Sequence, residues 1–337
     1  MARPNKEFEL AWAALACGGC ESGWNAIQLS AAGPIEVQAG RKSPEDAEAI
    51  LLSFPTTWLP HKEKLPEGNG FLVERVTSIG TTHQQLALTR QPTGSVELFG
   101  AMACDVVGAL DDATARGLSE DQMLRVFIRR VIAWQHFMSK GASLLGPEAE
   151  LGLVGELSFL RTLLDSGLAT EVALAGWIGP EDAIQDFHVG DGAVEVKATL
   201  STSGFPVKIG SLEQLDDATM SPLFLAAFRF ANNTEGETLP EIASDIEHRL
   251  GDDPATTVLL EEKLLRAGYL KSHMPKYTRL FTIRETRMYY VTEGFPRLTP
   301  AGVPSGIYRA TYDIDLDGLE NFRLELPAAL RALGVLQ

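Results

Sequence analysis

Two carboxylates and a lysine lie close together near the middle of the chain, in Asp186 and in the tripeptide Glu195-Val196-Lys197. Carboxylate oxygens are the ligands that hard divalent cations such as Mg²⁺ prefer, and a nearby ammonium can orient a water or balance charge on a phosphate. These residue types therefore suit a metal site for phosphodiester hydrolysis.

The stretch between these residues has the pattern of a β-hairpin. Apolar and polar residues alternate on both sides of Asp191-Gly192, a dipeptide that favours a type I′ turn. With those two residues at the centre, the predicted cross-strand pairs are Val189 with Val194, His188 with Glu195, Phe187 with Val196, and Asp186 with Lys197. A slip by one residue would mix polar and apolar side chains on both faces, which argues for this register.

The predicted polar face of the hairpin has a simpler interpretation as well. An exposed Asp–Lys pair across two strands is common and contributes only about 0.2–1 kcal/mol. His188 shares this face, but Mg²⁺ prefers oxygen to imidazole, so we expect His188 beside the ion and not on it.

A helix is predicted upstream, over residues 151–164, where leucines recur at helical spacing between Pro147 and Gly167. Gly152 and Gly155 each cost about 1 kcal/mol relative to alanine in a helix, so another backbone or a ligand is expected close to them. Glu156 lies beside the leucine stripe. It either reaches solvent at the edge of the helix or supplies a third carboxylate to the ion.

Gln214 follows the Glu-Val-Lys strand in a segment predicted as a strand that runs into a helix starting at Ser211. A side chain near the N-terminus of a helix could bind a phosphate or a metal-bound water. The alternative is an ordinary surface glutamine in the first turn of that helix.

The order of these elements, a helix with a glutamate, an aspartate on a strand and Glu-x-Lys on the next strand, resembles the PD-(D/E)XK nuclease superfamily. The chain is similar in particular to the poorly characterised branch called the PD-(D/E)XK motif protein family. The segments that carry this likeness are 152–157, 177–180, Asp186-Phe187, 195–199, 211–215 and 294–298. Gln185 stands where the superfamily name places proline.

The resemblance implies a role for each matching residue. Asp186 and Glu195 would bind Mg²⁺, with Mn²⁺ as a substitute, and Lys197 would assist the attacking water or stabilise charge on the phosphate. Glu156 matches the helix carboxylate of many members. The implied fold is a restriction endonuclease-like α/β (α+β) core with a mixed central sheet flanked by helices, and the implied product ends carry 5′-phosphates.

The overall charge of −16 is unfavourable for a protein that binds nucleic acid, since affinity depends on Lys and Arg. Residues 260–309 are an exception, with nine Lys or Arg against four Glu, a balance of +5. Basic residues alternate with tyrosines there on expected strands, so Lys276, Arg279, Arg284 and Arg287 are candidate nucleic-acid contacts. A solvated sheet face explains the same pattern equally well.

The chain of 337 residues is long enough for two domains. We expect a β-rich domain over residues 1–145, with strands near 24–29, 70–76, 85–88 and 95–99 and a final helix over 120–140. Ser119 and Gln122 would form the capping box of that helix. Residues 146–337 would form the nuclease-like domain, with helices near 239–250 and 256–267 and strands near 279–283, 288–292 and 308–314.

Several protein classes are disfavoured by composition. No apolar run approaches the roughly 20 residues that cross a bilayer, and the N-terminus lacks a signal-peptide layout, so a cytoplasmic protein without membrane contact is expected. Three cysteines give no disulfide framework, and Cys17 and Cys20 lack a second pair at zinc spacing. His61, His83 and His136 are isolated, and the sequence has no P-loop.

The sequence thus predicts a Mg²⁺-dependent DNA endonuclease, and relatives suggest a bacterial restriction or anti-phage system with other defence proteins as partners. Dimeric relatives make a homodimer the default expectation. Two interpretations compete with this prediction: a non-catalytic DNA-binding or scaffold subunit of a defence complex, and a hydrolase of RNA or small phosphate esters. The intact Asp186, Glu195 and Lys197 argue against the first.

Overall fold

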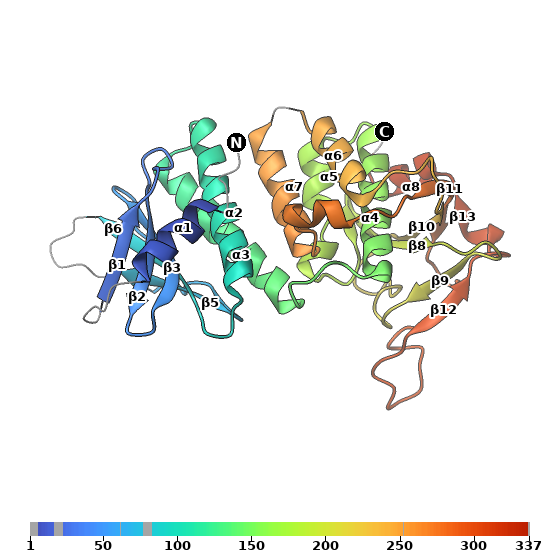
Figure 1. The fold of residues 1–337 in the computed structure, drawn as a ribbon. Coiled ribbons are helices and arrows are strands. Elements are labelled where there is room, and N and C mark those ends of the chain that lie inside the picture. The colour runs from blue at the N-terminus through green and yellow to red at the C-terminus, as the bar shows by residue number, and fades with distance from the viewer. Residues whose placement is uncertain (1–5, 17–22, 61, 77–82, 252, 336–337) are drawn as a thin grey trace. The chain divides into compact units, whose positions relative to one another are not determined.

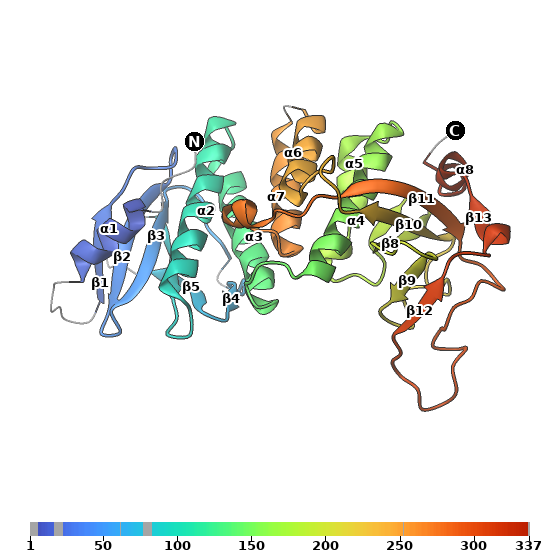
Figure 2. The ribbon, with the colours of Figure 1, turned by 45° about the vertical axis from the view of Figure 1, so that its right-hand side comes forward.

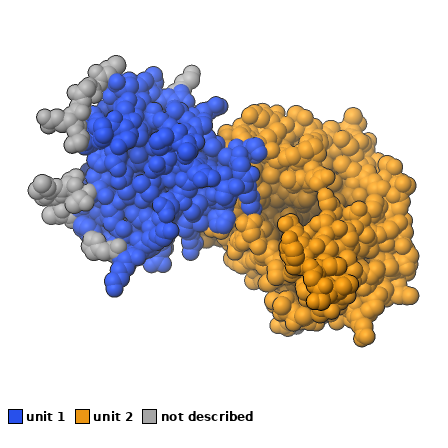
Figure 3. All heavy atoms as spheres, turned by 90° about the horizontal axis from the view of Figure 1, so that it is seen from below, with its two compact units in different colours: residues 1–143 blue, residues 144–337 orange. Residues whose placement is uncertain are grey.

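The computed structural model describes the whole chain except residues 1–5, 17–22, 61, 77–82, 252 and 336–337. The chain divides into two compact units, unit 1 over Met1–Ser143 and unit 2 over Leu144–Gln337 (Figure 3). Cys17, Cys20 and His61 lie outside the described residues, and the third cysteine, Cys104, is buried.

Unit 1 contains an antiparallel sheet of six strands in the order β1-β2-β3-β6-β5-β4 (Figure 1). The strands are β1 (Gly23–Gln28), β2 (Glu36–Ser43), β3 (Ala47–Phe54), β4 (Glu67–Gly68), β5 (Phe71–Val76) and β6 (Gln84–Arg90). The helices are α1 (Lys6–Leu15), α2 (Val96–Ala115) and α3 (Glu120–Ser139). Ring contacts of Trp12 with Phe99 and of Phe54 with Phe127 join the helices to one another and to the sheet.

Helix α3 confirms the predicted capping box, because Ser119 and Gln122 each bond the other's backbone N–H. The predicted strand over 95–99 is wrong. Ser95 is the N-cap of α2, and its side chain accepts a bond from the N–H of Leu98. The five-residue window was too short to show the helical period that continues to Ala115.

Unit 2 is built on a mixed sheet of five strands in the order β13-β11-β10-β8-β7, in which β8 and β10 are parallel and the other pairs antiparallel (Figure 2). Its strands are β7 (Phe187–Val189), β8 (Gly192–Thr199), β10 (Leu223–Ala231), β11 (Thr282–Tyr290) and β13 (Arg323–Leu324), while β9 (Pro206–Ile209) and β12 (Tyr312–Asp315) form a separate pair. Its helices are α4 (Pro147–Asp165), α5 (Thr170–Gly176), α6 (Leu239–Arg249), α7 (Pro254–Arg266) and α8 (Leu326–Ala332), with short 3-10 turns η1 (Gly179–Glu181), η2 (Lys271–Lys276) and η3 (Glu320–Phe322). The predicted α/β class with a mixed central sheet is confirmed.

Both faces of the unit 2 sheet are covered by apolar side chains. On one face, Val194 and Val196 of β8 pack with leucines of α4, including Leu153, Leu157 and Leu160. On the other face, Ala193 of β8 packs with side chains of the β9–β12 pair. The face of β8 that carries Glu195 and Lys197 is therefore half enclosed by protein, which brings these charges out of bulk water.

The predicted hairpin exists, but its turn and register are wrong. Phe187 pairs with Val194, His188 with Ala193 and Val189 with Gly192, so Gly190 and Asp191 form the two-residue turn. Gly190 has φ of 60°, as the first central residue of a type II′ turn requires. Gly192 serves another purpose, because a Cβ there would lie 2.2 Å from the carbonyl of Pro222. The observed register differs from the predicted one by two residues, so the same residues still share each face of the hairpin.

Three further predictions in unit 2 need correction. No helix follows Ser211, where the chain forms successive turns. The strands expected at 279–283 and 288–292 are one strand, β11, and Lys276 ends a 3-10 turn instead of lying on a strand. The last predicted strand is reduced to β12, because residues 308–311 are a loop. Among the described residues, no helix is long and apolar enough to cross a membrane.

Candidate active site

The five residues predicted to be catalytic line one hollow of about 540 Å³ in unit 2. Glu156 reaches it from α4, Asp186 from the residue before β7, Glu195 and Lys197 from β8, and Gln214 from the loop after β9. Lys208 and Asp313 from the β9–β12 pair line it as well. Residues from positions 148 to 313 thus meet at one opening, which the sequence alone could not establish.

Asp186 is fixed at the edge of the sheet by bonds on both sides. Its Oδ2 accepts a bond of 2.7 Å from the N–H of Val196, and its backbone carbonyl accepts bonds of 2.9 Å from Ile178 and Gly179. Continuing the β7–β8 register by one residue brings Asp186 level with Glu195, not with Lys197 as predicted. Burial raises the pKa of the Asp186 carboxyl, although Lys197 and the Val196 N–H oppose the rise.

Glu195 is fully buried, and Lys197 bonds only one of its oxygens. The Nζ of Lys197 lies 2.5 Å from Oε1 of Glu195, while Oε2 has no hydrogen-bond partner. Burial and the nearby Asp186 carboxylate raise the pKa of Glu195 well above its ordinary value. Burial alone would lower the pKa of Lys197, but Glu195 and Asp186 outweigh it and raise that pKa, so Lys197 is held as an ammonium.

Glu156 is held in place by a tryptophan whose role the sequence did not reveal. The indole N–H of Trp177 donates a bond of 2.7 Å to Oε2 of Glu156. A Cβ at Gly179 would lie 2.9 Å from the same oxygen and 3.0 Å from Oδ1 of Asp186, so glycine leaves room for both carboxylates. Lys263, only 2% exposed, bonds the Trp177 carbonyl and Glu181 and fixes this turn from behind.

Gln214 reaches Lys197 from a loop. A buried glutamine, Gln185, holds this loop in place. Oε1 of Gln214 accepts a bond of 3.3 Å from Nζ of Lys197 and one of 2.7 Å from the Gly210 N–H. The side-chain amide of Gln185, 2% exposed, donates to the backbone carbonyls of Glu213 and Gln214. Gln185 stands at the proline position of the motif, and only the fold showed that it positions this loop.

The chemistry of the donors fits a hard divalent cation. Five acidic residues line the hollow, and three of them, Glu156, Asp186 and Glu195, act electrostatically on Lys197. The unpartnered Oε2 of Glu195 is a buried acceptor that calls for a positive ligand. In the described part of the chain, no three acidic, His or Cys side chains already surround a common point as ligands. Lys197 bonds Oε1 of Glu195 and leaves Oε2 as the oxygen available to a cation.

A family model matches residues 8–317, and its description reads "Putative PD-(D/E)XK family member, (DUF4420)". The chain belongs to this family. Members of the PD-(D/E)XK superfamily are typically nucleases, and these nucleases generally use divalent metal ions. Comparison with curated proteins and with solved structures gives no significant match. The resemblance inferred from the motif segments is confirmed.

Two of the four basic residues predicted to contact nucleic acid in this DUF4420 protein are engaged in ion pairs. Arg279 pairs with the buried Glu150, and Arg287 with Glu285 and Asp317. Of the nine Lys and Arg between 260 and 309, three lack an ion pair among the described residues: Lys276, Arg284 and Arg309. These three are exposed. Fewer cations are therefore available to contact a phosphate backbone than the local charge of +5 suggests.

His188 does not line the hollow. It pairs with Ala193 on the hairpin, and its Nε2 is buried without a hydrogen-bond partner. Burial lowers the pKa of its imidazole, which favours the neutral ring. The expectation that His188 lies beside the ion and does not ligate it stays a prediction.

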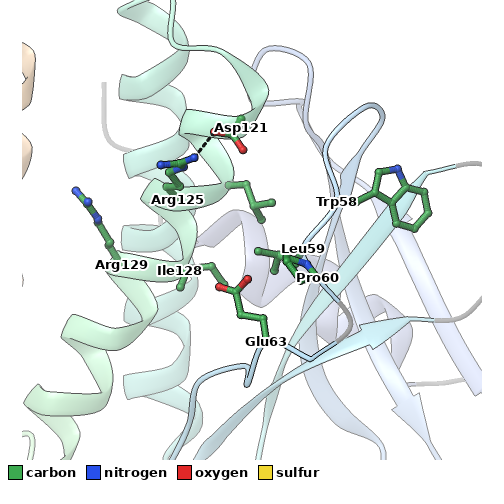
Figure 4. Close-up of a pocket in the computed structure, with 9 residues that line it drawn as sticks. Trp58, Leu59, Pro60, Glu63, Asp121, Arg125, Ile128 and Arg129 are labelled. Atoms are coloured by element: carbon green, nitrogen blue, oxygen red, sulfur yellow. Dashed lines mark ion pairs between the residues drawn. The ribbon is translucent and has the colours of Figure 1, made fainter.

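A separate hollow of about 360 Å³ lies in unit 1, between α3 and the loop that carries Trp58 (Figure 4). Its charges balance, because Arg125 and Arg129 face Glu63 and Asp121. Arg125 is already paired with Asp121 at 2.9 Å. This hollow holds no arrangement comparable to the buried carboxylates of unit 2.

Proposed function

We propose that this protein is a Mg²⁺-dependent DNA endonuclease, in which Mn²⁺ can substitute for Mg²⁺. The single observation that supports it best is the meeting of Asp186, Glu195 and Lys197 at one open hollow, with a buried carboxylate oxygen left unpartnered. A structural ion pair would not need three carboxylates around one ammonium, because burying unneutralised charge is costly.

Each side chain has a distinct part in the proposed reaction. Asp186, Glu195 and Glu156 would hold the cation, which supplies a water of lowered pKa and neutralises charge on the phosphate. Lys197, kept as an ammonium, would turn from Glu195 toward the phosphate oxygens and stabilise their developing charge. Gln214 limits the directions in which Lys197 can point. Trp177 keeps Glu156 from turning away.

The same proposal covers the setting of the enzyme. An overall charge of −16, with three cations lacking an ion pair among the described residues of 260–309, supports modest DNA affinity for this chain alone. Partner proteins of a restriction or anti-phage system would then supply positive surface and sequence recognition, a role supported by analogy with related nucleases. A homodimer and a cytoplasmic location belong to the same proposal.

The experiment is cleavage of supercoiled plasmid with Mg²⁺ or Mn²⁺ by the wild type and by Lys197→Ala, purified in parallel. Lys64→Ala is the matched control, because its side chain is 85% exposed in unit 1. We expect the wild type and the control to nick and linearise the plasmid and Lys197→Ala to be inactive. Equal cutting by all three would reveal a contaminant and refute the site.

Substrate class is settled with the same proteins. Duplex DNA, single-stranded DNA and RNA of one sequence are offered singly and in competition, and the ends are tested for 5′-phosphate by ligation. Preference for RNA would replace the DNA proposal with the hydrolase alternative. A wild type that binds DNA but cuts no substrate would favour the scaffold interpretation.

A further inference from the structure

A long loop leaves unit 2 just before β12 and projects away from the body of the unit in both ribbon views (Figures 1 and 2). We call residues 298–311, Leu298-Thr299-Pro300-Ala301-Gly302-Val303-Pro304-Ser305-Gly306-Ile307-Tyr308-Arg309-Ala310-Thr311, the arm. Two internal turns shape it, closed by N–H bonds of Gly302 to the Thr299 carbonyl and of Ile307 to the Pro304 carbonyl. The arm is thus an ordered surface loop with a defined path.

The tip of the arm exposes large side chains that the fold does not use. Tyr308 is 90% exposed and Ile307 46% exposed, while Arg309 beside them is exposed too. A tyrosine ring has a face on which a base or sugar can stack, and an arginine fork matches phosphate oxygens. Ile307, Tyr308 and Arg309 are consecutive, so they offer a continuous exposed surface that a partner can contact.

The charge of the arm differs from that of the rest of the protein. Its fourteen residues contain no Asp or Glu and one cation, Arg309, in a chain with net charge −16. Arg309 has no ion pair in the described part of the chain. A polyanion is repelled by most of this surface and meets no such repulsion along the arm.

Both ends of the arm are tied to the loop that presents Gln214. At one end, Arg297 bonds the Leu215 carbonyl at 2.7 Å and Asp217 at 2.8 Å. At the other end, Thr311 bonds the carbonyl of Gly210, whose N–H holds the Gln214 side chain. The hydroxyl of Tyr312 closes the base of the arm by bonding the backbone of Leu298.

The arm is also continuous with the wall of the hollow. It leads directly into β12, which pairs with β9, and these strands place Asp313 and Lys208 in the lining. The arm therefore begins next to the wall of the hollow that carries Lys208 and Asp313. The occupant that this position of the arm favours is the nucleic acid substrate.

We propose that the arm is a substrate-binding element that grips the nucleic acid backbone beside the scissile phosphodiester. Arg309 contacts a phosphate, and the ring of Tyr308 packs on the sugar next to it. Because the arm and Gln214 share the loop over residues 210–217, binding at the tip also steadies the contact between Gln214 and Lys197. This inference rests on the nuclease activity proposed above.

The test measures binding of full-length protein to a fluorescent duplex in EDTA, by anisotropy at several KCl concentrations, and KM and kcat for cleavage with Mg²⁺. We expect Arg309→Ala to weaken binding several-fold and to reduce the salt slope by about 1. Tyr308→Ala should weaken binding several-fold, and Tyr308→Phe should restore it, because the face of the ring makes the contact. In cleavage, these variants should raise KM more than they lower kcat.

Arg331→Ala is the matched control, an exposed arginine on α8 without an ion pair among the described residues. It should bind and cut as the wild type does. If the wild type cleaves, and Arg309→Ala and Tyr308→Ala bind and cleave as it does, the arm does not bind the substrate. The proposed nuclease activity would then stand. A wild type that neither binds nor cleaves nucleic acid would overturn both.

Discussion

The ammonium of Lys197 lies 2.5 Å from Oε1 of Glu195, two residues earlier on the same strand. Glu195 is fully buried and the Lys197 side chain is 16% exposed, so each is the main counter-charge of the other. The pair sits next to two further carboxylates, from Asp186 and Glu156, so the site carries more negative charge than Lys197 can balance. The carboxylates of the site therefore repel one another more than Lys197 offsets.

Lys197→Met should destabilise the metal-free protein by about 3–5 kcal/mol, because it leaves buried carboxylates without their cation. The double variant Glu195→Gln/Lys197→Met should recover a good part of that loss, since the uncompensated charge is gone. Urea unfolding in EDTA gives the four free energies of a double-mutant cycle. Additive effects of the two changes would show that the pair is not coupled.

Mg²⁺ should raise the melting temperature of the wild type, because an ion that binds only the folded state stabilises it by about 2.7 kcal/mol at 100 times its Kd. Asp186→Asn should abolish most of this shift. It should also leave the metal-free protein at least as stable as the wild type, since burial already disfavours the charged carboxyl. Asp121→Asn, on the exposed side of α3, is the control. An unchanged shift in Asp186→Asn would place the ion elsewhere.

Trp177→Phe should lower kcat by roughly 10- to 100-fold, the equivalent of a lost bond to a charged group worth about 1.5–3 kcal/mol. Trp134→Phe is a close control, because Trp134 donates the same kind of bond, 2.6 Å to Asp105, in unit 1. Both variants should lose similar stability, and only Trp177→Phe should lose activity. Equal activity losses would indicate a general effect on folding.

Gln185→Met should reduce activity by freeing the loop that carries Gln214, while its similar volume preserves packing. If Gln185 acts through Gln214, then Gln185→Met should add little to Gln214→Ala. Steady-state kinetics of the single and double variants measures this coupling. Independent losses that multiply would mean that Gln185 acts by another route.

Glu150, which does not line the hollow, should make the stability of the protein depend on pH. Burial raises the pKa of its carboxyl above the ordinary value near 4.5, and Arg279 only partly opposes this. At pH values between the unfolded and the folded pKa of Glu150, the folded state binds more protons than the unfolded state. The free energy of unfolding therefore falls as the pH rises through this range. Glu150→Gln should flatten this dependence and stabilise the protein at neutral pH. Glu148→Gln, an exposed carboxyl on the same helix, should change neither.

The sequence by itself determined the local elements and the chemistry they carry. The capping box at Ser119, the leucine stripe of α4 and the alternation around β7 and β8 depend on neighbours within a few residues, so their periods reveal them. The division of the hairpin into a polar and an apolar face could be predicted for the same reason. A register that differs by two residues leaves the same residues on each face. The motif segments likewise indicated the family that residues 8–317 match.

The turn in that hairpin depended on tertiary packing. Asp191-Gly192 has the composition of a type I′ turn, but the backbone of Pro222 presses on Gly192, and the turn moves to Gly190-Asp191. In β3, an apolar run without alternation gives no strand period, and only pairing with β2 and β6 defines it. Such elements are set by neighbours far away in the sequence.

The arrangement of the site also belonged to the tertiary structure. Trp177 bonding Glu156, Gln185 holding the loop of Gln214, and Lys263 fixing the turn behind them join residues 21 to 86 positions apart. A buried polar group must find its partner wherever the fold brings one, and no local pattern encodes that choice. Residue types thus predicted which chemistry is available, while burial and long-range hydrogen bonds decided the charge, orientation and accessibility of each group.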